Sequence, residues 1–148
     1  MEDRFFKLIT ELKEQLKQQS KPLKDFTLLT KPEKGKNLVW IMDQHREIGH
    51  TKVHYEVSLE GDLIWVEIHF EIKDLEKRAK FKNDIPNLPE KITWYTNRSS
   101  LSIRFIGNNL KLNNQNIIRE ISQQLLYLEV TVGDRIREVL NEINYKKK

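Results

Sequence analysis

Residues 52–73, KVHYEVSLEGDLIWVEIHFEIK, contain two stretches in which apolar and polar residues alternate, one on each side of Gly61 and Asp62. Alternation of this kind is typical of β-strands that bury one face, and a Gly-Asp pair between two such stretches is typical of a tight turn. We therefore expect one antiparallel hairpin. Because side chains alternate between the two faces of a strand, a two-residue turn also determines which residues face each other.

This register separates the hairpin into an apolar face and a polar face. On the polar face, His54 lies opposite His69. The neighbouring pair on the same face is Glu56 and Glu67. The apolar face would carry the facing pairs Val53/Phe70, Tyr55/Ile68, Val57/Val66 and Leu59/Ile64.

The hydrophobic pattern outside the hairpin predicts the remaining elements. We expect an α+β protein: a mostly antiparallel sheet with a central hairpin, an N-terminal amphipathic helix and a long C-terminal helix packed on one face. Gly133 and the β-branched residues 130–132 predict a kink in the last helix, or two helices in line. Helices are expected over 3–19, over 74–84 and from Asn114 onward. The last of these carries an apolar stripe from Ile118 to Ile143. Strands are expected over 26–29, 38–42, 91–96 and 101–106.

Length and composition indicate one domain over residues 1–148. The chain has no cysteine, which excludes thiolate catalysis, zinc-thiolate sites and disulfides. It also has no signal-peptide pattern at its start and no apolar run near the ~20 residues of a membrane span, so a cytoplasmic protein without a membrane contact is expected. The net charge is +4, but basic residues are interleaved with 22 acids, so the total charge alone does not indicate nucleic-acid binding.

Glu56 and Glu67 form an unusual pair, because like charges that face each other across a sheet are destabilising. Two carboxylates become tolerable if a cation lies between them or if one is protonated. Such a site, with Glu56, Glu67 and His54 as ligands, would bind Mg²⁺ or Mn²⁺. The alternative is structural: both acids point into water, or the following helix covers this face and supplies lysines.

His54 and His69 allow two interpretations in the same way. Two imidazoles with carboxylates beside them suit zinc or manganese, because an acid commonly orients a ligating histidine. Alternatively, they are half-buried histidines whose hydrogen bonds are satisfied locally. Trp40 alternates with apolar neighbours and is expected in the core.

One strand of the hairpin carries the acid Glu56, and the other carries the acid Glu67 two positions before the basic residue His69. This arrangement is similar to the core of the PD-(D/E)XK nuclease superfamily. The resemblance covers at most residues 1–96. It implies that Glu56 and Glu67 bind a divalent cation that activates water for phosphodiester hydrolysis, and that His69, which stands where the family has lysine, assists. The C-terminal part also resembles small uncharacterised proteins encoded near restriction and phage-defence systems.

Four side chains are candidates for contacts with nucleic acid. Lys73, Lys77 and Arg78 would reach phosphates, and Trp65 on the polar face would stack on a base. The alternatives are that the cations form an ordinary solvated helix surface and that Trp65 packs under the neighbouring helix.

The last helix is long enough to suggest a partner protein or a homodimer. Its stripe spans ~40 Å at 1.5 Å per residue, and Leu126, Tyr127, Val130 and Leu140 lie outside it and would widen an interface. If the helix bends over the sheet, these residues are hidden instead.

Two functions follow from these features. The first is a small binding or accessory module of a nucleic-acid-related system of the restriction or defence type, on a degenerate nuclease-like fold. The alternative is a metal-dependent nuclease or phosphodiesterase that uses Glu56, Glu67 and His69.

Overall fold

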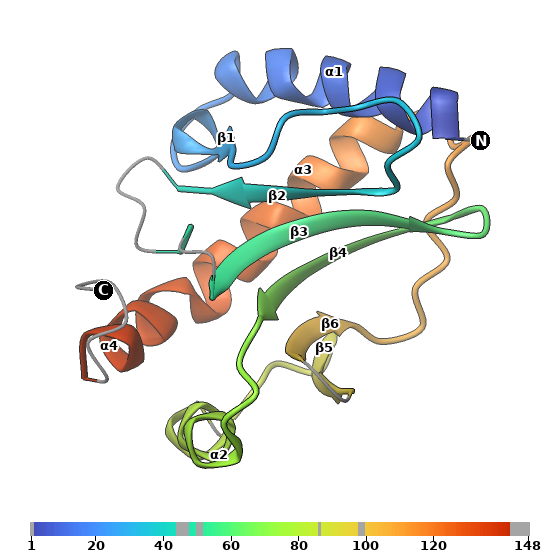
Figure 1. The fold of residues 1–148 in the computed structure, drawn as a ribbon. Helices are drawn as coiled ribbons and strands as arrows, with labels where there is room; N and C mark the ends of the chain where they lie inside the picture. Colours follow the sequence, from blue (N-terminus) through green and yellow to red (C-terminus); the bar gives the residue numbers. More distant parts are fainter. Residues whose placement is uncertain (1, 44–47, 50–51, 86, 98–99, 143–148) are drawn as a thin grey trace.

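The protein is described by a computed structural model, which covers residues 2–43, 48–49, 52–85, 87–97 and 100–142. Six strands form one antiparallel sheet in the order β1-β2-β3-β4-β6-β5 (Figure 1). The strands are β1 (Thr27–Leu28), β2 (Leu38–Met42), β3 (Val53–Glu60), β4 (Leu63–Phe70), β5 (Ile92–Thr96) and β6 (Leu101–Phe105), and the helices are α1 (Glu2–Lys17), the 3₁₀ turn η1 (Leu23–Asp25), α2 (Leu75–Asp84), α3 (Ile117–Leu128), the π-helix η2 (Glu129–Gly133) and α4 (Asp134–Glu142).

The central hairpin has the register that the sequence predicts. Gly61 has a φ of 64°, a conformation that glycine adopts without a steric penalty, and it allows the tight turn between β3 and β4. His54 is paired with His69, and Glu56 is paired with Glu67. The second hairpin is confirmed too, since Trp94 pairs with Ile103 in β5 and β6.

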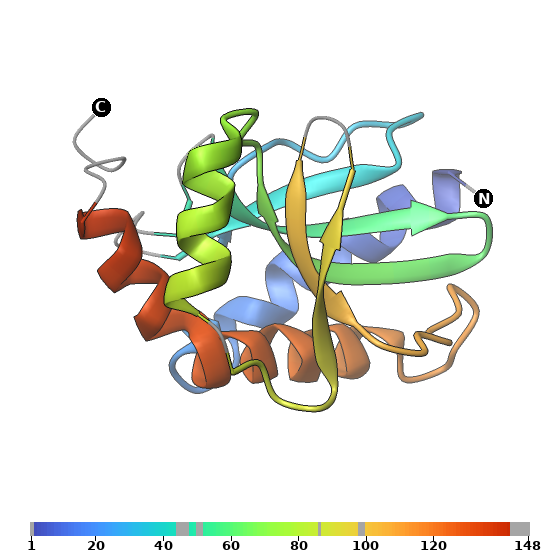
Figure 2. The same ribbon diagram turned by 90° about the horizontal axis from the view of Figure 1, so that it is seen from below.

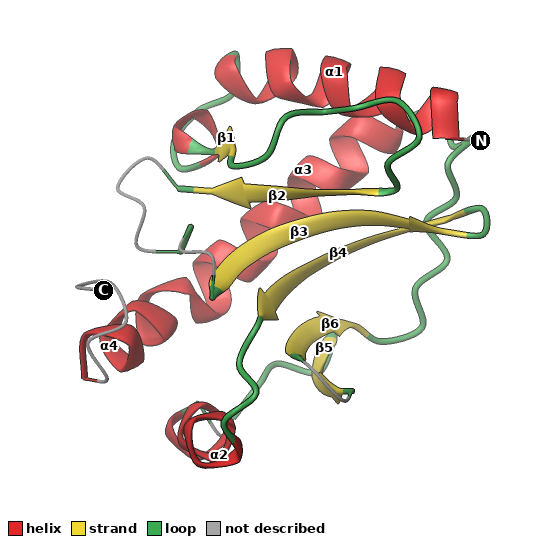
Figure 3. Cartoon of the chain, viewed as in Figure 1, coloured by secondary structure: helices red, strands yellow, loops and turns green. Residues whose placement is uncertain are grey.

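The helices α1 and α3 lie on one side of the sheet and bury its apolar face (Figure 3). The amphipathic stripe of α1, which includes Phe5, Ile9 and Leu12, is at most 2% exposed. At the end of the sheet, Phe81 of α2 packs against Phe70 with ring centroids 4.8 Å apart. The α+β architecture is therefore confirmed.

The long C-terminal helix runs as α3, η2 and α4 without interruption, and α4 turns away from the axis of α3 (Figure 2). The predicted irregularity is a π-helix over Glu129–Gly133. In Figure 2, α4 lies beside α2, where Lys80 bonds Asp84 at 2.8 Å and reaches Glu142 at 3.2 Å. Ile143, the end of the predicted stripe, lies outside the described residues. Among helices within those residues, none combines the length and the apolar character that crossing a bilayer would require.

The side chains that were expected to widen an interface on this helix lie in different environments. Leu140 is 1% exposed and belongs to the core, whereas Val130 is 70% exposed. Leu126 and Tyr127 are half-buried against the core. The partner protein or second copy at this helix stays a prediction.

Candidate functional site

The polar face of the sheet carries a row of side chains across four strands. Trp40 of β2 is the Cα partner of Glu56, Glu56 faces Glu67, and Glu67 faces Arg104 of β6. Because side chains at paired positions point to the same face, these four groups lie in line. Trp40 is thus on the polar face and not in the apolar core as expected.

Glu67 is held by two cationic side chains. Arg104 donates from Nε at 2.9 Å and from a terminal nitrogen at 2.8 Å, both to Oε2 of Glu67. Oε1 of Glu67 lies 3.1 Å from Nδ1 of His69. Glu67 is 3% exposed, and burial alone would raise its pKa, but the hydrogen bonds from His69 and Arg104 outweigh burial and lower the pKa.

Glu56 lies beside a neutral donor, Trp40, and beside the same imidazole, His69. The indole Nε1 of Trp40 donates to Oε1 of Glu56 at 3.1 Å. Nδ1 of His69 lies 3.5 Å from Oε2. Each of the four oxygens of Glu56 and Glu67 therefore has a protein donor or cation beside it, and the two acids do not point into water.

His69 is the cation between the two acids. Burial would lower its pKa, but hydrogen bonds to Glu56 and Glu67 dominate and raise the pKa to about 10. Its Nε2 also lies 3.0 Å from Oε1 of Glu71. The imidazole is thus protonated at neutral pH, and this charge, with that of Arg104, makes the facing carboxylates tolerable.

His54 packs between Trp40 and His69 in this cluster. Its ring is fully buried and stacks on Trp40 at 4.0 Å and on His69 at 5.5 Å between centroids. Its Nε2 is 4.0 Å from Oε1 of Glu56. Among the described residues, the group whose potential ligand atoms all lie within 4.8 Å of one another is Glu56, Glu67 and His69, so His69 takes the place expected for His54.

Arg104 is also the middle layer of an aromatic stack. Its guanidinium carbon lies 4.2 Å from the centroid of Trp65 and 4.1 Å from the centroid of Tyr95. These distances are typical of cation–π contacts. Tyr95 is 45% exposed, so the stack ends at the surface of the polar face.

The expected phosphate-binding cations lie outside this stack. Lys73 is exposed in the segment between β4 and α2, and Lys77 is half-buried on α2. Arg78 is 6% exposed, with its guanidinium bonded to the backbone carbonyls of Ile72 and Asn97. Arg78 thus anchors α2 and is not presented to solvent as a phosphate contact would be.

Sequence analysis missed Arg104 and Tyr95 as site residues. Both occupy positions on the polar face of the second hairpin, and the alternation of that hairpin could have identified them as polar-face residues. Their proximity to Glu67 and Trp65 requires that β6, and not β5, pairs with β4. Alternation within a hairpin does not reveal this pairing.

Comparison of the chain with protein-family models, with curated proteins and with solved structures finds no match. The resemblance to the PD-(D/E)XK superfamily stays a prediction. What the site offers chemically is a neutralised acid pair, Glu56 and Glu67, beside an exposed stack that ends in Tyr95.

Proposed function

We propose that this protein is a binding module of a nucleic-acid-related system of the restriction or defence type, and that its polar sheet face holds a base of a single strand. The observation that supports this is the stack of Trp65, Arg104 and Tyr95, whose outer ring is 45% exposed. Single-stranded nucleic acid is commonly bound by stacking of bases on aromatic rings and arginine planes.

The stack is held together by contacts within the protein, without a ligand. Arg104 is fixed by two bonds to Glu67 and by the ring on each side. All of these residues lie on strands of one sheet. A base that packs on the open surface of Tyr95 would therefore lose little binding energy to ordering of the protein.

Charge supports a mode of binding that depends on stacking more than on phosphate contacts. The two positive charges of His69 and Arg104 offset the two negative charges of Glu56 and Glu67. Glu71 adds a negative charge beside His69. We therefore expect affinity to fall only weakly with salt, in contrast to proteins that bind many phosphates.

The test is binding of fluorescein-labelled single-stranded DNA and RNA oligonucleotides, measured by anisotropy at two salt concentrations. Loss of one stacking ring costs about 1–3 kcal/mol, so Tyr95→Ala should weaken binding roughly 5- to 150-fold. Tyr95→Phe is the matched control, because it keeps the ring and should keep the affinity. Equal affinity of wild type and Tyr95→Ala, or no binding of either oligonucleotide, would contradict the proposal.

A metal-dependent nuclease or phosphodiesterase is the second candidate, and one observation favours it: ligand atoms of Glu56, Glu67 and His69 lie within 4.8 Å of one another. Carboxylate oxygens and an imidazole nitrogen are suitable ligands for Mn²⁺. A bound ion would have to replace the donors that now occupy these oxygens, which is why this candidate ranks second.

Thermal unfolding with and without millimolar MnCl₂ separates the two candidates. An ion that binds the folded state raises Tm by mass action. If this site binds the ion, wild type shows a shift that is absent in Glu67→Gln when each protein is compared with its own metal-free Tm. An equal shift in both proteins, or none in wild type, counts against the nuclease.

A further inference from the structure

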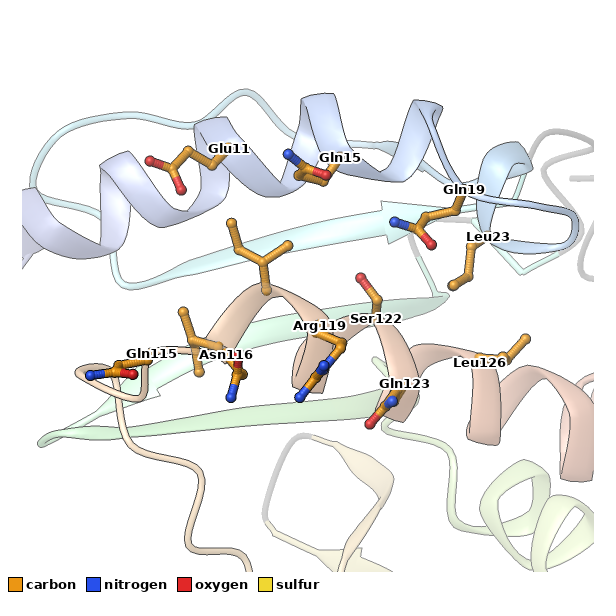
Figure 4. A pocket seen from close by; sticks show the side chains of 12 residues that line it. Glu11, Gln15, Gln19, Leu23, Gln115, Asn116, Arg119, Ser122, Gln123 and Leu126 are labelled. Carbon is orange, nitrogen blue, oxygen red and sulfur yellow. The ribbon is translucent and has the colours of Figure 1, made fainter.

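A groove of about 630 Å³ lies in the helix layer, lined by residues of α1, of α3 and of the segments beside them (Figure 4). Its described lining contains no aromatic ring, and its charged side chains are one acid, Glu11, and one base, Arg119. These groups do not select a class of ligand. A more specific set of groups lies on the free edge of the sheet, at β5.

β5 is an edge strand, because its one neighbour in the strand order is β6. In an antiparallel pair, residues that bond the neighbouring strand alternate with residues whose N–H and C=O point away from it. The amide of Asn97 bonds the carbonyl of Ser100, which fixes this alternation for the β5–β6 hairpin. Ile92, Trp94 and Thr96 therefore direct their backbone groups away from β6.

Two of these outward amides, those of Trp94 and Thr96, are available to another chain. The amide of Ile92 bonds the carbonyl of Pro89, whereas the other two have no backbone acceptor among the described residues. In Figure 2, β5 lies in front of β6, and no other described element is drawn over it. The edge is therefore open to a further strand.

The two edges of the sheet differ in the features that normally prevent pairing with another chain, which are shortness, proline and charged side chains. β1, at the other edge, is two residues long, and Lys31 and Pro32 follow closely in the chain. β5 has five residues, ITWYT, without a charge, a proline or a glycine. All five are residue types that favour strands. The composition of β5 thus favours pairing.

We propose that β5 pairs with β5 of a second copy of this chain, in antiparallel direction and about a twofold axis at Trp94. Of the antiparallel alignments, this one pairs all five residues of each strand. Trp94 and Trp94 of the second copy exchange both backbone hydrogen bonds, and Thr96 of each copy donates to the carbonyl of Ile92 of the other. Both available amides thus find an acceptor, and the two six-stranded sheets become one continuous sheet.

The facing side chains suit a second copy on both faces of the sheet. On the face toward the helices, the half-buried ring of Trp94 packs on Phe70 with centroids 5.7 Å apart, and Trp94 of the second copy covers more of it. On the polar face, Tyr95 lies opposite Thr93 of the second copy, a favourable cross-strand pair. No like charges face each other within the strand, so pairing with itself carries no electrostatic penalty. Closed twofold dimers are also the commonest oligomers.

Amide hydrogen exchange of the unmodified protein, followed by NMR, tests this pairing at millimolar concentration and after dilution to tens of micromolar. Five residues from each copy bury less area than a permanent dimer does, so we expect the dimer to dissociate over this range. The amides of Trp94 and Thr96 should exchange severalfold more slowly at the higher concentration. The amide of Tyr95 points toward β6 and reports any change in overall stability. Unchanged exchange of Trp94 and Thr96 would overturn the proposal.

Sedimentation velocity of two variants at one position tests the role of the backbone amide. Thr96→Pro removes two of the four bonds across the axis but no bond to β6, so the dissociation constant of the dimer should rise roughly 5- to 150-fold. Thr96→Ala keeps the amide and should keep the dimer. A wild type that is monomeric at millimolar concentration, or an equally tight dimer of Thr96→Pro, would contradict the pairing. If near-UV circular dichroism shows that Thr96→Pro is unfolded, the exchange rates of wild type decide.

Discussion

Nδ1 of His69 lies 3.1 Å from Oε1 of Glu67, inside a face where both side chains are largely buried. The protonated imidazole therefore reduces the repulsion between the two carboxylates, as a bound metal ion would. Because the charge belongs to a titratable group, the stability of the sheet is coupled to pH.

The first prediction concerns this pH dependence. The pKa of His69 is about 10 in the folded protein, against 6.5 ordinarily, so the folded state binds this proton more tightly than the unfolded state does. The stabilisation is complete below about pH 6.5 and is lost as pH rises toward 10. The pKa of Glu67 is lowered, so its contribution is lost as pH falls below about 4.5. Urea unfolding from pH 4 to 10 should thus show a maximum near pH 5–6.5.

His69→Gln separates this effect from the other titrations. Glutamine keeps a donor but has no charge, so the decline above pH 6.5 should become shallower than in wild type. At pH 6 the variant should lose about 3–5 kcal/mol, the cost of breaking a buried ion pair. A decline as steep as that of wild type would show that another group causes it.

The second prediction concerns Arg104. Arg104→Lys keeps the charge but loses the planar fork that bonds Glu67 and stacks between Trp65 and Tyr95. We expect a loss of about 1.5–3 kcal/mol in the free energy of unfolding, as for hydrogen bonds to charged groups. Arg119→Lys on exposed α3 surface is the control and should change stability by less than about 0.5 kcal/mol. Equal effects of the two variants would contradict this role of Arg104.

The third prediction concerns the π-helix. A Cβ at Gly133 would lie 2.6 Å from Oε2 of Glu129 and 3.1 Å from a terminal nitrogen of Arg137. Glu129 cannot move away cheaply, because Arg137 bonds both of its oxygens at 2.7 and 2.6 Å. Gly133→Ala should therefore destabilise the protein, whereas the same change in an ordinary helix stabilises by about 1 kcal/mol.

A double-mutant cycle tests the cause. If the clash with the Glu129 carboxylate is responsible, Gly133→Ala should become neutral or stabilising in a Glu129→Ala background. The measurement is the free energy of unfolding in urea for the four proteins. An unchanged penalty in that background would place the strain in the backbone.

The fourth prediction concerns Tyr55, whose hydroxyl donates to Oε1 of Glu129 at 2.6 Å from within the apolar face. Tyr55→Phe should cost about 1.5–3 kcal/mol, because it removes a hydrogen bond to a charged group. Burial, followed by the nearby Glu129 charge, raises the pKa of Tyr55 well above its ordinary value of 10. Spectrophotometric titration of wild type to pH 11 should thus give the same tyrosinate signal as the variant, and a larger wild-type signal would contradict this.

Local patterns predicted much of this architecture for physical reasons. The β3–β4 register follows from a two-residue turn, because alternation over eight residues on each side admits one alignment that buries the apolar set. Gly133 indicated that the middle of the last helix would be irregular, but the sequence did not indicate that the irregularity is a π-helix. The bonds of its first residue, Glu129, to Tyr55 of β3 and Arg137 of α4 join groups from different elements of the fold.

The sequence by itself determined that Glu56 faces Glu67 and that His54 faces His69, since these pairs are set by neighbours along the chain. Only the tertiary structure decided what neutralises the acids, because Arg104 is 37 residues from Glu67 in the chain and reaches it when β6 pairs with β4. The same pairing brings Tyr95 and Trp65 to opposite sides of Arg104. Pairing between distant strands depends on how the whole apolar face is buried, and alternation within one hairpin carries no information about it.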